Sequence, residues 1–157
     1  MPEIFTGPLT NDDIFQICTF GVLPAWILLV VLPHWSWTGH IVHSIIIPVI
    51  LGVAYTWFFA SGAFSGDQGG GFNSLDQLMI LFTQPAAVLA GWIHYLVFDL
   101  FVGAWEVRDA KRRGLNHLLV LPSLVLTLMA GPMGLLLYLL TRAAFRKGGF
   151  SLKESVA

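Results

Sequence analysis

The fold is decided by Leu89–Arg113, LAGWIHYLVFDLFVGAWEVRDAKRR, which begins as an apolar run long enough to cross a membrane. Two ionisable residues, His94 and Asp99, lie inside that run. Charged residues then mark its exit, namely Glu106, Arg108 and Asp109. An ionisable side chain at bilayer depth costs about 2.5–3.5 kcal/mol on insertion scales, so such residues usually face a protein interior, have a partner and serve a function. The stretch therefore predicts a polar site inside a membrane protein.

The composition also indicates a membrane protein. Of the 157 residues, 56% are hydrophobic and 11% are charged, whereas soluble globular domains have about 45–50% and about 25%. The net charge of −1 gives no electrostatic basis for binding nucleic acid. The single cysteine, Cys18, cannot form an intrachain disulfide and carries no information on the redox compartment.

The N-terminal sequence, MPEIFTGPLTNDDIF, is acidic. A secretory signal begins with a basic region, and an organelle transit peptide is rich in arginine and serine and poor in acidic residues. The sequence therefore predicts an integral, multi-pass protein of a bacterial inner membrane or, as a mature protein without its presequence, of a thylakoid.

Four apolar segments are long enough to cross a hydrocarbon core of about 30 Å, which takes about 20 helical residues. They cover approximately residues 14–32, 40–60, 78–104 and 117–140. They predict an all-α, polytopic membrane protein, a four-helix transmembrane bundle formed by one domain over residues 1–157. Asn11-Asp12-Asp13 is expected as the cap and acidic first turn of the first span, and Ser74 with Gln77 as a capping box for the third.

Prolines interrupt these spans. Pro48 lies inside the second span, and Pro85 and Gly131-Pro132 are expected to kink the third and fourth, because a proline frees a backbone carbonyl. For Gly131-Pro132 a second interpretation stays open, a break between two half-helices that returns the C-terminus to the side from which it came. Orientation stays open as well, because the eight lysines and arginines form two clusters of four, which four full spans place on opposite faces. Only the half-helix interpretation places both clusters on one face.

An up-and-down arrangement brings the loop after the first span to the same face as the exit of the third span. Three histidines in or near that loop are then expected at the same depth as His117 and the charged residues that end the third span: His34, His40 and His43. The polar residues therefore converge on one half of the membrane.

Helical geometry groups the polar residues of the third span. Trp92, Tyr95, Asp99 and Glu106 share one face, because steps of three, four and seven residues return nearly to the same azimuth. His94 lies about 140° from Asp99 and about 7.5 Å along the axis, so these two side chains cannot meet directly on this helix.

Acid–base chemistry would suit these residues. A carboxyl group buried in apolar surroundings can donate a proton near neutral pH, which makes Asp99 the first candidate acid and Glu106, nearer to water, the second. His43 and His94 are candidate bases or orienting groups. The alternative is that Asp99 and His94 are structural, since interhelical hydrogen bonds in membranes are worth about 0.6–2 kcal/mol.

Two further features carry weaker signals. His40 and His43 with His94 and Asp99 could form a mixed metal site, but no Glu-x-x-His or His-Glu-x-x-His pattern is present, so no metal is predicted. The glycine-rich Ser65–Phe72, SGDQGGGF, lacks the Lys-Ser/Thr of a phosphate loop and is expected to be a turn between spans.

Aromatic residues make up 13% of the chain. Their places near the span ends are typical of interfacial belts, and an aromatic-lined groove would also suit a long polyene or isoprenoid. Candidate substrate-binding residues lie along the third span: Trp92, Tyr95, Trp105, Arg108 and Asp109. The alternative for Glu106, Arg108 and Asp109, followed by Lys111–Arg113, is a solvated helix end with local ion pairs.

Two segments, GWIHYLVFDLFVGAWEVRDAKRRG and HLLVLPSLVLTLMAGPMGLLLYLLTR, resemble the neoxanthin-synthase-like family, also named for abscisic acid deficiency. The motifs of the family stand here at His94-Tyr95, Phe98–Trp105, Arg108-Asp109 and Gly131–Tyr138. The resemblance is sharp over residues 71–142 and follows only the general layout before them.

The resemblance implies a four-span protein of pigmented membranes and, since no transit peptide is evident, a bacterial or cyanobacterial member. In plants the family is needed to convert violaxanthin into neoxanthin, an isomerisation that opens an epoxide and forms an allene. That reaction needs a proton donor and a base but no redox change, so no cofactor is expected. Asp99 as the acid and His94 as the base fit this chemistry, for a xanthophyll epoxide or a related isoprenoid.

Two other classes of function stay open. One is a non-catalytic binding or accessory protein for carotenoid, quinone or lipid, and the other is a small structural membrane protein or transporter component. The expected partners are a carotenoid or isoprenoid lipid and membrane lipids, and a homo-oligomer or a pigment-enzyme complex stays open. Only the enzyme requires both Asp99 and His94, because a binding protein should tolerate conservative changes.

Overall fold

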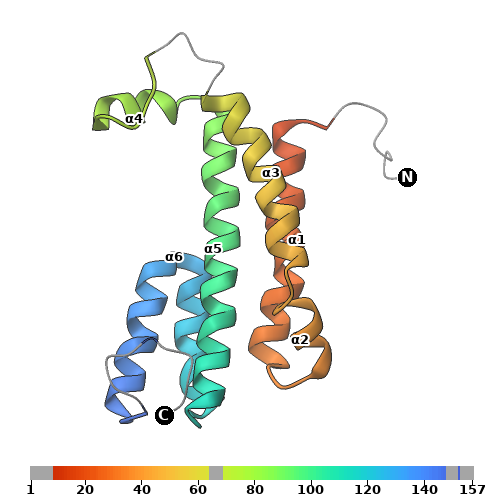
Figure 1. Ribbon diagram of the computed structural model, residues 1–157, viewed down its shortest axis with the longest axis vertical. Coiled ribbons are helices and arrows are strands. Elements are labelled where there is room, and N and C mark those ends of the chain that lie inside the picture. The colour runs from red at the N-terminus through yellow and green to blue at the C-terminus, as the bar shows by residue number, and fades with distance from the viewer. Residues whose placement is uncertain (1–8, 64–68, 148–151, 153–157) are drawn as a thin grey trace. The chain divides into compact units, whose positions relative to one another are not determined.

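The computed structural model describes residues 9–63, 69–147 and 152, which form α-helices and no strands (Figure 1). The helices are α1 (Asn11–Val31), α2 (Ser36–Ile41), α3 (Ile46–Ala63), α4 (Leu75–Leu81), α5 (Pro85–Arg112) and α6 (His117–Ala144). Four stretches are long and apolar enough to cross a membrane: Asn11–Val31, Ser36–Ser61, Pro85–Arg112 and His117–Ala144. The predicted all-α class is confirmed. Residues 65–68 of the glycine-rich segment, residues 148–151 and Lys153 lie outside the described residues.

The chain forms two compact units, and α1 and α5 each contribute to both. Among the described residues, unit 1 comprises residues 9–22 together with those of Pro48–Leu96, and unit 2 comprises Leu23–Ile47 together with residues 97–147 and 152. In unit 1, the indole N–H of Trp92 donates a hydrogen bond to Thr19 Oγ1 at 2.8 Å. In unit 2, α1 packs closely on α5, because a Cβ atom added to Gly103 would lie 2.7 Å from the ring of Trp26.

Helix starts follow the capping rules, with one correction. Ser74 Oγ accepts a hydrogen bond from the Gln77 N–H at 3.2 Å, so this predicted cap is confirmed, although it begins the short α4. At α1 the cap is Thr10, one residue before the predicted group. Thr10 Oγ1 accepts from the Asp13 N–H at 3.2 Å, and Asp13 Oδ2 accepts from the Thr10 N–H at 2.8 Å. The acidic first turn of α1 is as predicted.

Pro85 begins a helix where a kink was expected. The third span was predicted from about residue 78, but α4 ends at Leu81 and α5 begins at Pro85. Proline suits the first position of a helix, because the N–H that it lacks would have no intrahelical partner there. Pro48 is likewise the third residue of α3, so it does not interrupt that helix.

The α6 segment reverses its direction at Ala130, whose backbone leaves the helical conformation (φ −157°, ψ 61°). Figure 1 shows the two halves of α6 running antiparallel. A straight helix would place Arg142 about 38 Å from His117, yet Arg142 Nη1 lies 3.0 Å from Asp109 Oδ2, near the end of α5. The half-helix interpretation of Gly131-Pro132 is therefore the one that the structure follows. Pro132 favours the break, because it has no N–H to bond to the carbonyl of residue 128 and its ring would clash with that carbonyl.

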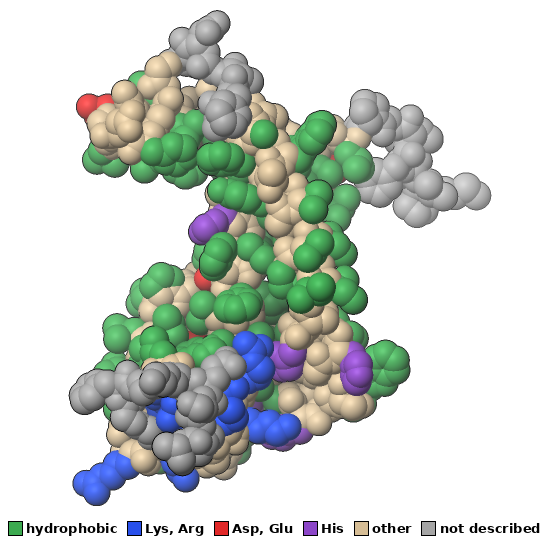
Figure 2. Space-filling model, in the orientation of Figure 1, with side chains coloured by type: hydrophobic (Ala, Val, Ile, Leu, Met, Phe, Trp, Pro, Cys, Tyr) green, Lys and Arg blue, Asp and Glu red, His purple; other side chains and the backbone are tan. Residues whose placement is uncertain are grey.

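The reversal decides where the basic residues lie. Arg113 Nη1 donates a hydrogen bond to the Lys147 carbonyl at 3.3 Å, so the end of α5 and the end of α6 adjoin. Figure 2 shows Lys and Arg side chains gathered over these ends. The two basic clusters, as far as the structure describes them, thus share one face, as the half-helix interpretation required.

Gly134 allows the two halves of α6 to pack closely. A Cβ atom added to Gly134 would overlap the backbone nitrogen and hydroxyl of Thr127, on the opposite half. We expect Gly134→Ala to lower the free energy of unfolding by about 1–3 kcal/mol or more, since overpacking forces the halves apart. Unfolding in mixed micelles, followed by circular dichroism, measures the change.

Gly21→Ala is the matched control for this prediction. Gly21 lies in α1 with no atom within 4 Å of an added Cβ. Replacing a helical glycine by alanine there should be neutral or stabilise by about 0.5–1 kcal/mol. Equal stability of the Gly134→Ala and Gly21→Ala proteins would contradict the close packing of the hairpin.

Candidate buried carboxyl site

Asp99 and Glu106 lie two turns apart on α5, in unit 2, and both are buried. Asp99 is 8% exposed and Glu106 is 0% exposed. The expectation that Glu106 is nearer to water is therefore wrong. The expectation failed because α6 folds back over this face of α5. The position of Glu106 near a polar helix end gives no sign of that reversal.

Both carboxyl groups contact the reversed α6. Thr127 Oγ1 donates a hydrogen bond to Glu106 Oε1 at 2.9 Å. Within the described part of the chain, Glu106 Oε2 has no hydrogen-bond partner. A Cβ atom added to Gly131 would overlap the Asp99 carboxyl group, so this group lies directly against the break in α6.

The break in α6 shapes the electrostatics around Asp99. The second half of α6 begins at Gly131, and the N-terminal end of a helix carries a partial positive charge of about half an elementary charge. Because Asp99 packs against Gly131, this end favours negative charge on the Asp99 carboxyl group. Irregular backbone at membrane depth is tolerated where protein buries it or where it lines a cavity. Gly131 is buried.

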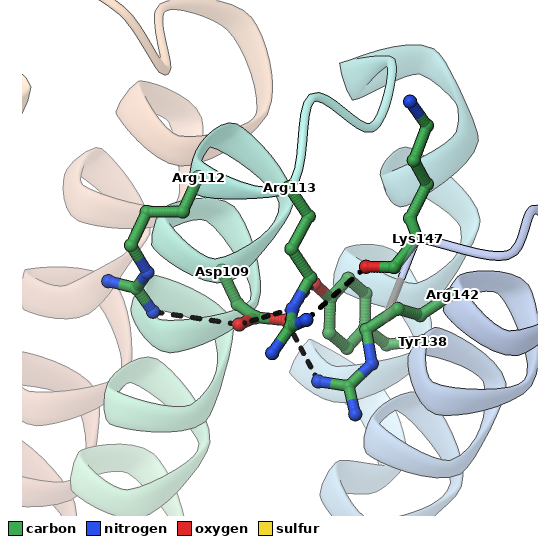
Figure 3. Close-up of polar contacts among 6 residues, drawn as sticks. All are labelled: Asp109, Arg112, Arg113, Tyr138, Arg142 and Lys147. Atoms are coloured by element: carbon green, nitrogen blue, oxygen red, sulfur yellow. Dashed lines mark hydrogen bonds and ion pairs between the residues drawn. The ribbon is translucent and has the colours of Figure 1, made fainter. Parts of the chain in front are cut away.

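Asp109 holds the far end of the α6 hairpin (Figure 3). Its Oδ2 accepts hydrogen bonds from Tyr138 Oη at 2.7 Å, from Arg142 Nη1 at 3.0 Å and from Arg113 Nε at 2.8 Å. Arg112 Nη2 lies 3.6 Å from Oδ1. Asp109 is 1% exposed and Arg142 is 3% exposed. The solvated helix end considered for Asp109 is therefore wrong, because Asp109 is buried and two of its four partners, Tyr138 and Arg142, come from α6. The local ion pairs with Arg112 and Arg113 are present.

The other predicted residues of unit 2 lie near the same polar end. Arg108 Nη1 donates to His43 Nδ1 at 2.9 Å, so the region after the first span and the exit of the third do share a face. The rings of His34 and His117 lie 6.3 Å apart, which agrees with that arrangement. Trp105 meets Tyr138 edge to face at 5.5 Å.

The remaining predicted residues belong to unit 1. Trp92 stacks on Tyr95 at 5.2 Å between ring centroids, and His94 lies 5.8 Å from the ring of Tyr55. His94 thus lines a pocket of unit 1, whereas Asp99 lies against Gly131 in unit 2. Their separation of five residues along α5 already turns them about 140° apart.

No group of three or more His, Cys, Asp or Glu side chains within the described ranges could hold a metal ion. Sequence reasoning missed Thr127, Tyr138 and Arg142, which complete the two carboxyl clusters. Tyr138 and the two glycines were visible as parts of the Gly-Pro-x-Gly-Leu-Leu-Leu-Tyr motif. Their pairing with α5 depends on the reversal at Ala130, and no local pattern predicts it.

Comparisons with known proteins identify related sequences. The ABA DEFICIENT 4-like family matches residues 13–138. The chain is 27% identical over 138 residues to the protein ABA DEFICIENT 4, chloroplastic, of Arabidopsis thaliana, covering 84% of this chain and 61% of that protein. It thus spans less than two thirds of the length of this relative. No solved structure matches the chain.

Four helices that are long and apolar enough to cross a bilayer, together with a chloroplastic relative, identify a membrane protein. Its bacterial or cyanobacterial origin stays a prediction. The family match covers most of the chain and includes the motifs on α5 and α6 that form the carboxyl site. The resemblance seen in the sequence is confirmed, and the chain belongs to the ABA DEFICIENT 4-like family.

Proposed function

We propose that this membrane protein is an acid–base isomerase of an epoxy-carotenoid or a related isoprenoid, and that Asp99 and Glu106 handle the proton. The observation that carries the proposal is the burial of these two carboxyl groups against the broken α6. A purely structural carboxyl group would be expected to have both of its oxygens satisfied, as Asp109 has. Glu106 Oε2 has no hydrogen-bond partner among the described residues.

Two carboxyl groups buried together disfavour the state in which both are ionised. The pair therefore holds at least one proton at the start of the reaction. Asp99 keeps 8% exposure and is the member that reaches the substrate, whereas Glu106 has no exposed surface and acts through Asp99. Glu106 is thus a positioning residue.

The reaction that the family resemblance implies proceeds without a change in redox state. Asp99 donates its proton to the epoxide oxygen while the carbon–oxygen bond breaks and an alcohol forms. The carboxylate left on Asp99 takes a proton from the adjacent polyene carbon. The electron pair of the broken carbon–hydrogen bond forms the second double bond of the allene. The donated proton is thereby replaced, so atoms and electrons balance without a co-reactant.

The N-terminal end of the second half of α6 assists this step. Negative charge appears on Asp99 between the two proton transfers. The partial positive charge at Gly131 lies against that carboxyl group and stabilises the charge as it develops. Such preorganised dipoles are most effective where water is excluded.

Conversion of violaxanthin by the purified protein tests the proposal. The protein is reconstituted in liposomes with violaxanthin at neutral pH, without nucleotide or flavin, and the pigments are separated by chromatography. We expect an allenic product of unchanged mass, absent from liposomes without protein. Bound pigment that is not converted, for violaxanthin and for the mono-epoxide antheraxanthin alike, would contradict the isomerase and favour the non-catalytic binding protein.

A further inference from the structure

An aromatic pocket lies in unit 1, apart from the residues of the carboxyl site. Its volume is about 180 Å³, and α3, α4, α5 and the adjacent connections supply its walls: Tyr55, Phe59, Phe72, Leu81, Phe82, Ala87, Ala90, Gly91 and His94. Small residues of α5 form one wall, so the pocket exists because Ala87, Ala90 and Gly91 leave space.

A continuous run of rings also lines the pocket. Phe72 lies 6.0 Å from Phe59, Phe59 stacks on Tyr55 at 5.6 Å, and Tyr55 lies 5.8 Å from His94. Aromatic faces favour flat, apolar partners. His94 is exposed in this pocket and is, with the hydroxyl-bearing Tyr55, its source of polar atoms.

The size of the pocket limits what it can hold. An apolar cavity of about 150 Å³ is sufficient for benzene, so about 180 Å³ accommodates one substituted six-membered ring and not a whole carotenoid. Phe72 and Phe82 are 65% and 47% exposed, so the mouth is open and a long chain can extend outward from the ring.

We propose that this pocket binds the oxygenated six-membered ring at one end of a cyclic carotenoid, and that His94 forms a hydrogen bond with the ring oxygen. The choice of carotenoid as the ligand class rests on the proposed function, whereas the preference for a ring rests on the pocket itself. His94 lines the pocket, and an imidazole nitrogen can donate a hydrogen bond to an oxygen of the ligand or accept one from its hydroxyl group.

Three pigments distinguish binding of the ring from binding of the polyene chain, and the contribution of the ring oxygen from that of the hydrocarbon. Zeaxanthin has hydroxylated rings, β-carotene has rings without oxygen, and lycopene has no ring. We expect the purified protein in nanodiscs to bind zeaxanthin most tightly, β-carotene less tightly and lycopene at least tenfold more weakly than zeaxanthin. Absorption and induced circular dichroism of the pigment measure the dissociation constants. Equal binding of lycopene and zeaxanthin would overturn the proposal.

Substitutions locate the binding. Gly91→Leu places a side chain in the pocket, where an added Cβ already lies 3.1 Å from the ring of Phe82, and should weaken zeaxanthin binding at least tenfold. Gly21→Leu makes the same change where no atom lies within 4 Å of the added Cβ, and should leave binding unchanged. Zeaxanthin binding that survives in a folded Gly91→Leu protein would place the ligand elsewhere.

His94→Phe keeps the volume of the side chain and removes its hydrogen bond. We expect this variant to bind zeaxanthin no better than β-carotene, with β-carotene binding unchanged and with partial rescue by His94→Asn. An unaltered preference for zeaxanthin in His94→Phe would contradict the role of His94, even if Gly91→Leu does not fold. Ring-selective binding by a protein that converts no epoxide would contradict the isomerase alone and leave this inference intact.

Discussion

An Asp99→Asn variant is expected to convert its substrate about 10²–10⁴-fold more slowly than the unchanged protein, the usual contribution of a positioned acid or base. The amide has nearly the same shape as the carboxyl group, so it fits against Gly131 and preserves the hairpin. It cannot give and then recover a proton. Initial rates in liposomes, with circular dichroism to verify the fold, measure the effect.

Asp76→Asn is the control for this change, because Asp76 is an exposed carboxyl group in the first turn of α4. Its rate should equal that of the unchanged protein. Glu106→Gln should shift the pH profile of conversion as well as its rate, which a structural residue would not do. A folded Asp99→Asn protein with full activity would remove Asp99 from the mechanism.

Asp109→Ala is expected to lower the free energy of unfolding by about 3–5 kcal/mol, the range found when one partner of a buried ion pair is removed. Asp109 accepts hydrogen bonds from Tyr138, Arg142 and Arg113, and Arg142 is 3% exposed. The substitution leaves the Arg142 guanidinium buried without this carboxylate. Since Asp109 connects α5 to the second half of α6, the hairpin should open first.

Titration with a denaturing detergent, followed by far-ultraviolet circular dichroism, gives the free energy. A double variant, Asp109→Leu with Arg142→Met, removes both charges and should recover a large part of the loss, because well-packed apolar residues often replace a buried pair at little cost. A loss below 1 kcal/mol for Asp109→Ala would show that the Asp109 cluster contributes little to the fold.

The sequence alone determined the features that depend on neighbouring residues. Hydropathy over windows of about 20 residues located the apolar helices, and Ser74 with Gln77 located the start of α4. The 3.6-residue period placed Asp99 and Glu106 on one face of α5. The motifs on α5 and α6 identified the family. Each of these signals lies within one helix or one turn.

Only the tertiary structure decided which segments meet. Proline at position 132 allowed either a kink or a reversal, and the contacts of Arg142 and Tyr138 with Asp109, 33 and 29 residues away, decided for the reversal. The same reversal buried Glu106 and paired it with Thr127. These outcomes depend on the free energy of contacts between distant segments, which propensity and periodicity along the chain do not contain.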